Sequence, residues 1–539
     1  MEKKKNKYLG PLLSLTMVLL ALLTGLQLGK MKGRRIVFAD TEDNNLSAVM
    51  GYVSKYYVDR IDIDSLSDKF IPEILKELDP HSIYIPASEL MRSDEPLEGN
   101  FEGIGITFNM FNDTVVVVSV IAGGPSSASG VNVGDRIISV NDSTVAGKRI
   151  ARDSLVSLLR GKSGSKVQIR VKRSGFADLL PLEITRGKIP IKSIDVAYMI
   201  TPTTGYLGIN KFSKTTYQEF VVAIKELSSR GMSGIILDLR DNPGGFLEQA
   251  VAVAGELFAE KRLIVYAEGQ TVPRENRYSP GNGKCGKTKI AVLINEHSAS
   301  ASEIIAGAIQ DNDRGFVVGQ RSFGKGLVQQ MFLLPDNAGL RLTTARYYMP
   351  SGRSLQRKYE HGTRAMENYY GELRRRHESG EHQNADSIKH ADTTKYYTCG
   401  GRVVYGGGGI TPDIFVPSKF DIEMKRMEDL AYGYAFAFGD KHREELNRIN
   451  TLGDLEGFFE RHDPYPEFLA YLQANPSGLS AEKIRLSKKF SEQALKSFVA
   501  MQTPLEETGS AFFKNRDDET VRAALKAIES NDTGGKDSV

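Results

Sequence analysis

"SGIILDLRDNPGGFLEQAVAVAGELF", Ser233 to Phe258, contains an apolar run, a polar turn with two glycines and then apolar residues at helical spacing. The same order returns in "KIAVLINEHSASASEIIAGAIQDND", Lys289 to Asp313. A further apolar strand pattern, "GYLGINKFS", and a helical pattern, "TYQEFVVAIKELSSRG", precede both, from Gly205 to Gly231. Strand and helix patterns that alternate in this way predict an α/β layer with parallel strands in its core.

Upstream of this region, from about Gly99, the sequence has a pattern of short strands and turns. "FEGIGITFNM" is followed by "VGDRIISVN", Val133 to Asn141, by one amphipathic helix and by further strands. This order resembles a PDZ domain. The resemblance implies a carboxylate-binding loop whose backbone N–H groups hold the C-terminus of a peptide while the peptide adds a strand to the sheet edge. The loop residues are Gly103, Ile104, Gly105 and Ile106.

The N-terminus carries an export signal. Four lysines within the first seven residues precede an uncharged, largely apolar stretch from Tyr8 to Gly29. The length is near the roughly 20 residues that span a bilayer, and no clear small-x-small cleavage site follows. A retained anchor is therefore favoured over a cleaved signal peptide, and both remain open. Either one predicts a bacterial envelope protein, anchored in the inner membrane and facing the periplasm or secreted into it.

Composition excludes several classes of protein. Seventy basic and sixty-seven acidic residues leave a net charge of +3, without a basic stripe, so no nucleic-acid partner is expected. Cys285 and Cys399 are the only cysteines, which leaves one disulfide as an open possibility. His377 and His382 are five residues apart and should not share a helix face. We therefore predict no metal site and no cofactor.

Three serines at alternating positions, Ser298, Ser300 and Ser302, stand where a strand gives way to a helix. Such a junction exposes a hydroxyl and directs first-turn N–H groups at its target, although a serine there is often only a helix cap. The neighbouring His297 is a poor candidate base, because adjacent side chains at a turn seldom meet. Lys325, flanked by two glycines and by apolar segments, is the better one, since such surroundings lower a lysine pKa.

The stretch "SASASEIIAGAIQDNDRGFVVGQRSFGKGLVQQ" is similar to the active-site region of the carboxyl-terminal processing peptidases, also called tail-specific proteases. Ser300 and Lys325 stand twenty-five residues apart, as the Ser–Lys dyad of that family does. Other family motifs appear in the same order along roughly residues 45 to 418: "LDPHS", the PDZ domain, "DLRDNPGG", "YYMPSGRSLQ" and "GGGITPD".

This resemblance implies a role for each matching residue. Ser300 is the nucleophile, Lys325 the general base and Gln329 the residue that orients the lysine. The backbone N–H of Ala301 and one from the Gly244–Gly245 turn form the oxyanion hole. Ser298 and Ser302 are left as structural residues. Asp311 also falls at a family position, although its place on a helix predicts a surface carboxylate.

The resulting fold class is a multidomain α/β protein with a PDZ domain and a protease core that resembles the tail-specific proteases (crotonase/Clp-protease-like). The predicted boundaries are 1–34 for the basic segment and anchor, 35–95 for a helical region, 96–188 for the PDZ domain, 189–356 with 396–418 for the protease core, 357–395 for an exposed charged insertion, and 419–539 for a helical region. The last two regions could shape a substrate channel or assemble protomers.

The predicted function is a serine endopeptidase that recognises the C-terminal region of exported protein substrates for processing or degradation. Its partners are proteins or peptides with a free C-terminus, the inner membrane, and an open possibility of a homo-oligomer or a regulatory partner. A penicillin-recognising acyl-enzyme is a weaker alternative, based on the Ser-x-x-Lys sequences at Ser322 to Lys325 and Ser163 to Lys166. A non-catalytic PDZ scaffold is the third alternative.

Overall fold

The computed structural model describes residues 45–111, 113–360, 362, 365–418, 422–475 and 478–530. The predicted anchor and the C-terminal tail lie outside these residues. Among the helices of the described residues, none is both long and apolar enough to span a bilayer. The chain divides into two compact units, Met1–Ile71 and Pro72–Val539. In the first unit, α2 (Asn45–Tyr56) and the start of α3 (Ile63–Lys76) fall within the stretch predicted to be helical.

The centre of the second unit is a six-stranded sheet with the strand order β10-β11-β12-β15-β16-β21. Its first pair, β10 (Ile194–Met199) and β11 (Thr204–Ile209), is antiparallel, and every later pair is parallel. The parallel strands are β12 (Gly234–Asp238), β15 (Lys289–Ile294), β16 (Phe316–Gly319) and β21 (Ile414–Phe415). All five residues of β12 are buried, which explains its uninterrupted apolar sequence.

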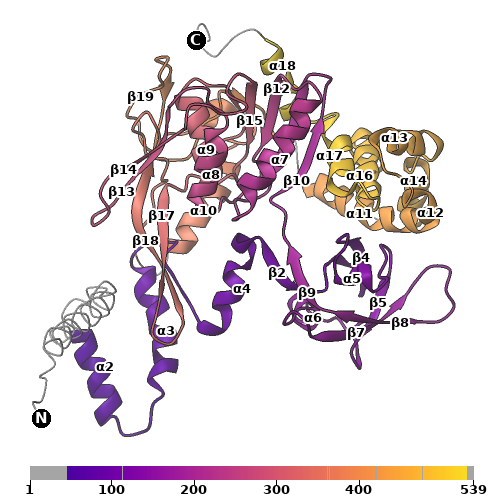
Figure 1. Cartoon of the computed structure of the whole chain (residues 1–539), viewed down its shortest axis with the longest axis horizontal. Helices are drawn as coiled ribbons and strands as arrows, with labels where there is room; N and C mark the ends of the chain where they lie inside the picture. Colours follow the sequence, from indigo (N-terminus) through magenta and orange to yellow (C-terminus); the bar gives the residue numbers. More distant parts are fainter. Residues whose placement is uncertain are drawn as a thin grey trace, which may run out of the picture. The chain divides into compact units, whose positions relative to one another are not determined.

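Helices cover both faces of this sheet. One face packs against α7 (Thr216–Ser229), α8 (Leu247–Gly255) and α9 (Ala301–Asp311), which Figure 1 shows beside β12 and β15. The other face packs against α18 (Glu519–Glu529), near the C-terminus, through Val521, Ala524 and Ile528. The predicted C-terminal helical region is therefore not a wholly separate domain, because its last helix, α18, is part of the core around the six-stranded sheet.

A second sheet flanks the first. Its strands are β1 (Ile83–Ile85), β13 (Leu263–Glu268), β14 (Glu275–Tyr278), β17 (Leu327–Leu333) and β18 (Gly339–Tyr348). β18 pairs with β1, β13 and β17, and β17 follows the glycine-flanked loop that contains Lys325. The short turn before β1 therefore lies beside β18, which also pairs with the strand that leads out of the lysine loop.

The predicted PDZ region forms its own sheet, in the order β3-β4-β5-β7-β8, with the two-residue strand β6 (Ser143–Thr144) beside β5. These strands are β3 (Ile106–Phe111), β4 (Thr114–Val120), β5 (Arg136–Val140), β7 (Lys166–Lys172) and β8 (Leu180–Thr185). Two helices, α5 (Pro125–Ala128) and α6 (Arg152–Leu159), accompany the sheet. The antiparallel pair of β2 (Asn100–Gly103) and β9 (Gly187–Pro190) connects this domain to α4 (Ala87–Glu98) and to the main sheet.

The charged composition of residues 357–395 predicts an exposed insertion, but part of this insertion is buried. It contains α10 (Ala365–Glu378) and a 3-10 turn (Ala385–Ser387), and the pair of β19 (Tyr396–Tyr397) and β20 (Val403–Val404) follows it. Tyr369 on α10 is 2% exposed, and its ring packs edge-on against His81 and Phe323. Helix α10 ends at Glu378 and the chain turns back, so the rings of His377 and His382 stack at 3.8 Å although they do not share a helix face.

A bundle of helices follows, drawn in orange and yellow in Figure 1. It consists of α11 (Ile422–Lys441), α12 (Arg443–Leu446), α13 (Leu452–Arg461), α14 (Tyr465–Ala474), α15 (Ala481–Leu486), α16 (Lys488–Ala500) and α17 (Glu506–Asn515). Its core is aromatic, with Phe438, Phe458 and Phe468 almost fully buried. One hydrogen-bonded ion pair, Arg136 to Asp440 at 2.5 Å, joins the end of α11 to the PDZ strand β5.

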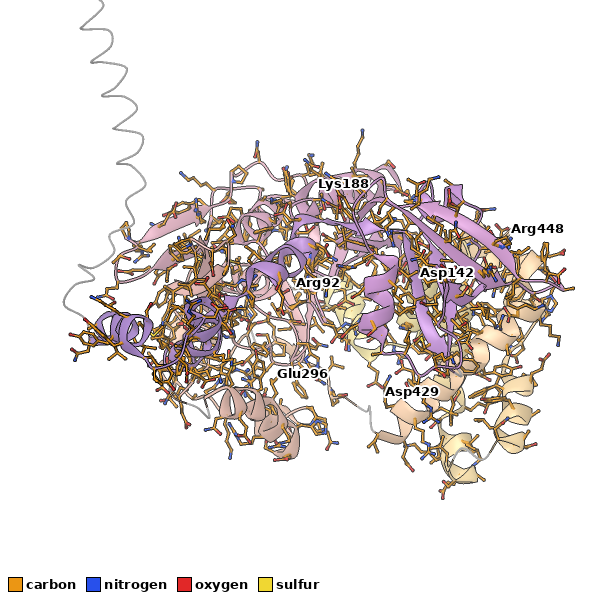
Figure 2. All side chains as sticks on the ribbon, turned by 90° about the horizontal axis from the view of Figure 1, so that it is seen from below. Arg92, Asp142, Lys188, Glu296, Asp429 and Arg448 are labelled. Carbon is orange, nitrogen blue, oxygen red and sulfur yellow. The ribbon has the colours of Figure 1, made fainter. Side chains whose placement is uncertain are left out.

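Charged side chains of both signs are distributed over the surface. Figure 2 labels four exposed examples, Asp142, Lys188, Asp429 and Arg448. The two cysteines are free thiols, with Cys285 buried and Cys399 exposed. The parallel sheet, the small PDZ sheet and the helical C-terminal part together confirm the predicted fold class.

Candidate functional site

The turn between β15 and α9 holds Ser300 in a left-handed backbone conformation, with φ 53° and ψ −112°. A residue with a Cβ atom rarely adopts positive φ, and such a conformation costs on the order of 1–3 kcal/mol. Strain of this kind persists where the surroundings impose it, and it gathers at functional turns. The conformation places Ser300 immediately before the first turn of α9, where free N–H groups point outward.

The two neighbouring serines have structural contacts. Ser298 is buried, and its hydroxyl donates to the Leu239 carbonyl at 2.7 Å. Ser302 is also buried, and its hydroxyl donates to the Asn242 carbonyl at 3.0 Å. The side chain of His297 is 58% exposed and lies 3.8 Å from Glu296, away from the residues that line the cleft below.

A buried carboxylate connects the serine turn to the lysine loop. Glu303 is fully buried, and its Oε2 atom accepts hydrogen bonds from the backbone N–H of Ser300 and from that of Lys325, each at 2.8 Å. Its Oε1 atom accepts from the Gly324 N–H at 2.7 Å and from the Ser322 hydroxyl at 2.5 Å. Burial raises the pKa of Glu303, and these hydrogen bonds oppose that rise. One side chain therefore fixes the distance between the two loops.

Lys325 has an environment that favours its neutral form. Burial is the main cause that lowers its pKa, to about 8, and the positive charge of Arg341 lowers it further. Asp79 and Glu303 act in the opposite direction. The nearby His81 has a pKa lowered to about 3, by burial first and by Lys325 second, so its ring is neutral around pH 7. Lys325 is thus able to gain and lose a proton in the physiological range.

One glycine of the predicted pair approaches the serine turn very closely, and the other packs against the Phe212 backbone. A Cβ atom on Gly244 would lie 2.8 Å from the Ser300 Cβ and 2.9 Å from the Ala301 nitrogen. The Gly244 N–H already donates to the Asn242 side chain at 2.8 Å, whereas none of the hydrogen bonds among the described residues uses the N–H of Gly245. Gly245 and Ala301 both line the cleft with Ser300. Of the predicted glycine pair, Gly245 is therefore the better placed donor.

Gln329 lies in the same cleft and hydrogen-bonds to strand β18. Its side-chain nitrogen donates to the Thr343 hydroxyl at 3.3 Å, and that hydroxyl donates to Asp79 at 3.1 Å. Asp79 also accepts from the Ser82 hydroxyl at 2.6 Å. The predicted role of Gln329 in orienting the lysine stays a prediction. The structure adds a series of side-chain hydrogen bonds from Gln329 through Thr343 to Asp79 in the "LDPHS" turn.

The predicted residues meet in a cleft of about 540 Å³. Its lining includes Gly245, Ser300, Ala301, Lys325 and Gln329, together with Arg341, Tyr347 and part of β17. The Tyr347 hydroxyl donates a hydrogen bond to the Lys325 carbonyl and so supports the backbone of the lysine loop. Beside the loop, the Arg357 guanidinium lies between the rings of Phe323 and Tyr369, 4.0 and 3.8 Å from their centroids.

One expectation from the sequence is wrong, and the weaker Ser-x-x-Lys alternative finds no support. Asp311 is not a surface carboxylate: it is 1% exposed and pairs with Arg353 at 2.7 Å, because the side of α9 that carries it packs against the loop after β18. The Ser-x-x-Lys sequence at Ser322 does not present a nucleophile, because that hydroxyl is buried and donates to Glu303. In the second copy, Lys166 pairs at the surface with Glu183.

The PDZ loop has the placement that its sequence predicts. Gly103 ends β2, Gly105 has φ 76°, and Ile106 begins β3, which lies at the edge of its sheet. The Ile104 side chain is 3% exposed and anchors the loop in the domain core. A peptide strand can therefore add to β3 next to the loop.

Sequence reasoning missed three groups around Lys325: Glu303, Asp79 and Tyr347. A signal for Glu303 exists, since Ser-x-x-Glu before an apolar run is a helix-start pattern. Asp79 and Tyr347 lie in the motifs "LDPHS" and "YYMPSGRSLQ", but these motifs come from distant parts of the chain and nothing in them indicates a position beside Lys325.

Comparison with known proteins agrees with this geometry. The model of peptidase family S41 matches residues 203–363, and that of the PDZ domain matches residues 103–184. The carboxy-terminal-processing protease of Bartonella bacilliformis is 38% identical over 309 residues, which are 56% of this chain and 70% of that protein. The carboxy-terminal processing protease CtpB of Bacillus subtilis is 30% identical over 346 residues, 63% of this chain and 72% of that protein.

Among solved structures, the photosystem II D1 C-terminal processing protease aligns with 70% of this chain and 88% of its own, at 26% identity and a TM-score of 0.37. The relatives from Bartonella and Bacillus are matched over more than two thirds of their own length. The chain therefore belongs to peptidase family S41, as one of the carboxy-terminal processing proteases that contain a PDZ domain.

Proposed function

We propose that this peptidase is a serine endopeptidase in which Ser300 is the nucleophile and Lys325 the general base. One observation carries the proposal: the N–H groups of Ser300 and Lys325 donate to the same buried oxygen of Glu303, and both residues line one cleft. A nucleophile and a base must be held in a fixed relation, and a shared buried carboxylate supports that relation.

In the proposed reaction, neutral Lys325 accepts the proton of the Ser300 hydroxyl as the oxygen attacks the substrate carbonyl. The N–H groups of Ala301 and Gly245 stabilise the oxyanion, each by about 3 kcal/mol. Protonated Lys325 then gives its proton to the leaving amine, and an ester forms on Ser300. Water, activated by the neutral lysine, hydrolyses this ester. Gln329 orients the lysine through its contact with Thr343.

The proposed substrates are exported proteins whose C-termini bind the PDZ domain. The relatives are named for carboxy-terminal processing, and the loop from Gly103 to Ile106 precedes an edge strand, as peptide capture requires. The basic and apolar N-terminal sequence supports a place in the bacterial envelope, either anchored in the inner membrane or secreted into the periplasm.

A pair of peptides tests the substrate proposal. A peptide with a free C-terminal carboxylate should be cleaved with a kcat/KM at least roughly ten-fold above that of the same peptide amidated, because hydrogen bonds to a charged group contribute about 1.5–3 kcal/mol. The measurement is kcat/KM well below saturation. Equal values for the two peptides would contradict recognition of the carboxylate and would leave the proposed dyad intact.

Two glycine variants locate that recognition. Gly105→Ala should reduce the preference, because a Cβ atom there would meet the Ile189 side chain at 3.0 Å in a left-handed conformation. Gly123→Ala is the matched control, since Gly123 also has a left-handed φ of 71° but its Cβ atom would point into open space. An unchanged preference in Gly105→Ala would place carboxylate recognition outside this loop.

The charge on Arg341 provides a test of the base. Arg341→Gln should raise the pKa of Lys325, because the arginine charge helps to lower it. The rising limb of kcat/KM against pH should therefore move to higher pH, with a lower rate at pH 7. Arg346→Gln is the control, since Arg346 lies on the same strand but lines a different cavity. A limb that stays in place in Arg341→Gln would show that Lys325 is not the titrating group.

A further inference from the structure

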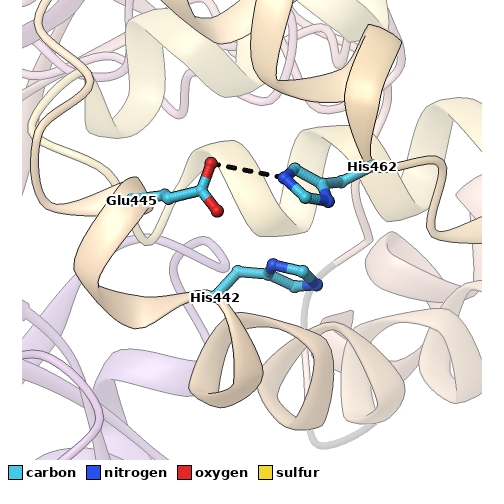
Figure 3. Close-up of side chains that lie close together, drawn as sticks. All are labelled: His442, Glu445 and His462. Carbon is cyan, nitrogen blue, oxygen red and sulfur yellow. Dashed lines mark hydrogen bonds and ion pairs between the residues drawn. The ribbon is translucent and has the colours of Figure 1, made fainter.

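A cluster of two histidines and one glutamate lies in the helical bundle, away from the proposed catalytic cleft. His442 precedes α12, Glu445 lies in α12 one turn later, and His462 ends α13. Figure 3 shows the three side chains converging from these two helices. Their nearest ligand atoms all lie within 4.8 Å of one another, and His462 Nε2 is 3.3 Å from Glu445 Oε2.

The geometry points to a binding site for a divalent transition metal ion, and we propose that His442, Glu445 and His462 bind Zn²⁺. Two imidazoles and one carboxylate are a ligand set that suits zinc, with the fourth position left to water. Tetrahedral bonds of ~2.0–2.2 Å place ligand atoms roughly 3.3–3.6 Å apart. The His462–Glu445 pair already has this separation, and the His442 ligand atom lies within 4.8 Å of both partners.

The surroundings favour metal binding over a purely structural contact. The titratable and charged groups that face the His442 ring are His462, Lys441, Glu445 and Glu467. Phe438 and Phe458 pack against the His442 ring at 4.6 and 5.7 Å and limit its movement. Lys441 is itself paired with Glu467 at 2.7 Å.

One group competes for the carboxylate. Arg461 lies 3.6 Å from Glu445 but is 62% exposed, so a metal ion can replace it at little cost. The bound ion would tie the end of α11 to the end of α13, two residues from the Asp440 that pairs with the PDZ strand. The site is therefore expected to stabilise the bundle where it meets that domain.

Calorimetric titration with zinc chloride tests this inference. The protein is the full-length chain with Ser300→Ala, which prevents self-digestion, after chelator treatment and dialysis. We expect one tightly bound equivalent and a higher melting temperature with zinc. His442→Ala and His462→Ala should remove both effects. Glu445→Gln, at a side chain that is 47% exposed and so compatible with folding, should weaken binding at least ten-fold.

The stacked pair of His377 and His382 supplies the matched control. The double variant His377→Ala, His382→Ala should keep the zinc equivalent and the increase in melting temperature, because none of the three proposed ligands changes. Three results would overturn the inference: no saturable binding in the parent protein, undiminished binding in Glu445→Gln, or loss of the equivalent in the His377, His382 control alone. Circular dichroism of each variant verifies its fold.

Discussion

Ser300→Ala should lower kcat/KM for peptide cleavage by at least about 10⁴-fold, because removal of the nucleophile leaves only binding and the oxyanion hole. The variant should fold normally. The hydrogen bond from the residue 300 N–H to Glu303 does not need the side chain, and alanine has the same backbone restrictions as serine at this left-handed position. Steady-state kinetics and thermal unfolding of the same preparation measure both properties.

Ser298→Ala and Ser302→Ala are the matched controls. Ser298→Ala removes the hydrogen bond from its hydroxyl to the Leu239 carbonyl and the one that the hydroxyl accepts from the Asn295 N–H. Ser302→Ala removes one hydrogen bond to the Asn242 carbonyl, and each lost bond should cost about 1 kcal/mol in stability. Both variants should retain measurable cleavage. A Ser300→Ala enzyme with full activity, or a Ser298→Ala enzyme with none, would remove Ser300 from the role of nucleophile.

Lys325→Ala and Lys325→Arg should both lower kcat/KM, by about 10²–10⁴-fold, because arginine stays protonated and cannot accept the serine proton. In the parent enzyme the neutral lysine is the competent form. Since its pKa is about 8, the rate should rise as pH increases through that value, by about ten-fold from pH 7 to pH 9. The measurement is kcat/KM across this range.

His297→Ala distinguishes the alternative base. The exposed histidine should be dispensable, so the variant should keep the same rising limb. If His297→Ala removes the limb while Lys325→Ala keeps it, the lysine is not the base. The partly buried neighbour His81 does not confuse this test, because its pKa of about 3 places its titration far below the range.

Local patterns predicted most of the fold. The apolar run of β12 and the strand–turn–helix order around Ser300 predicted a parallel sheet with buried strands. The glycine loop before β3, together with the strand pattern that follows it, predicted the PDZ domain. These signals are local, since each depends on residues within one element or one turn. Ser300 and Lys325 were predicted through the resemblance of one contiguous stretch to a known family, because a serine at such a junction is often only a helix cap.

Long-range contacts account for what the sequence did not predict. Asp79 reaches Thr343 across more than two hundred positions of sequence, and only the pairing of β1 with β18 brings them together. His442 and His462 belong to different helices, so their spacing matches no motif. Asp311 was expected at the surface because a helix position alone does not reveal what packs against it.

During synthesis, the core around the six-stranded sheet can be completed only after α18 has been made. The buried side chains of this helix cover Ile236, Leu293 and Val318, and Asp518 just before it pairs with Arg240 at 2.6 Å. A ribosome adds roughly 200 residues between Lys325 and this helix, which at ~5–20 residues per second takes on the order of 10–40 s. Until α18 has been synthesised, a nascent chain therefore carries its proposed nucleophile and base on a sheet with one uncovered face.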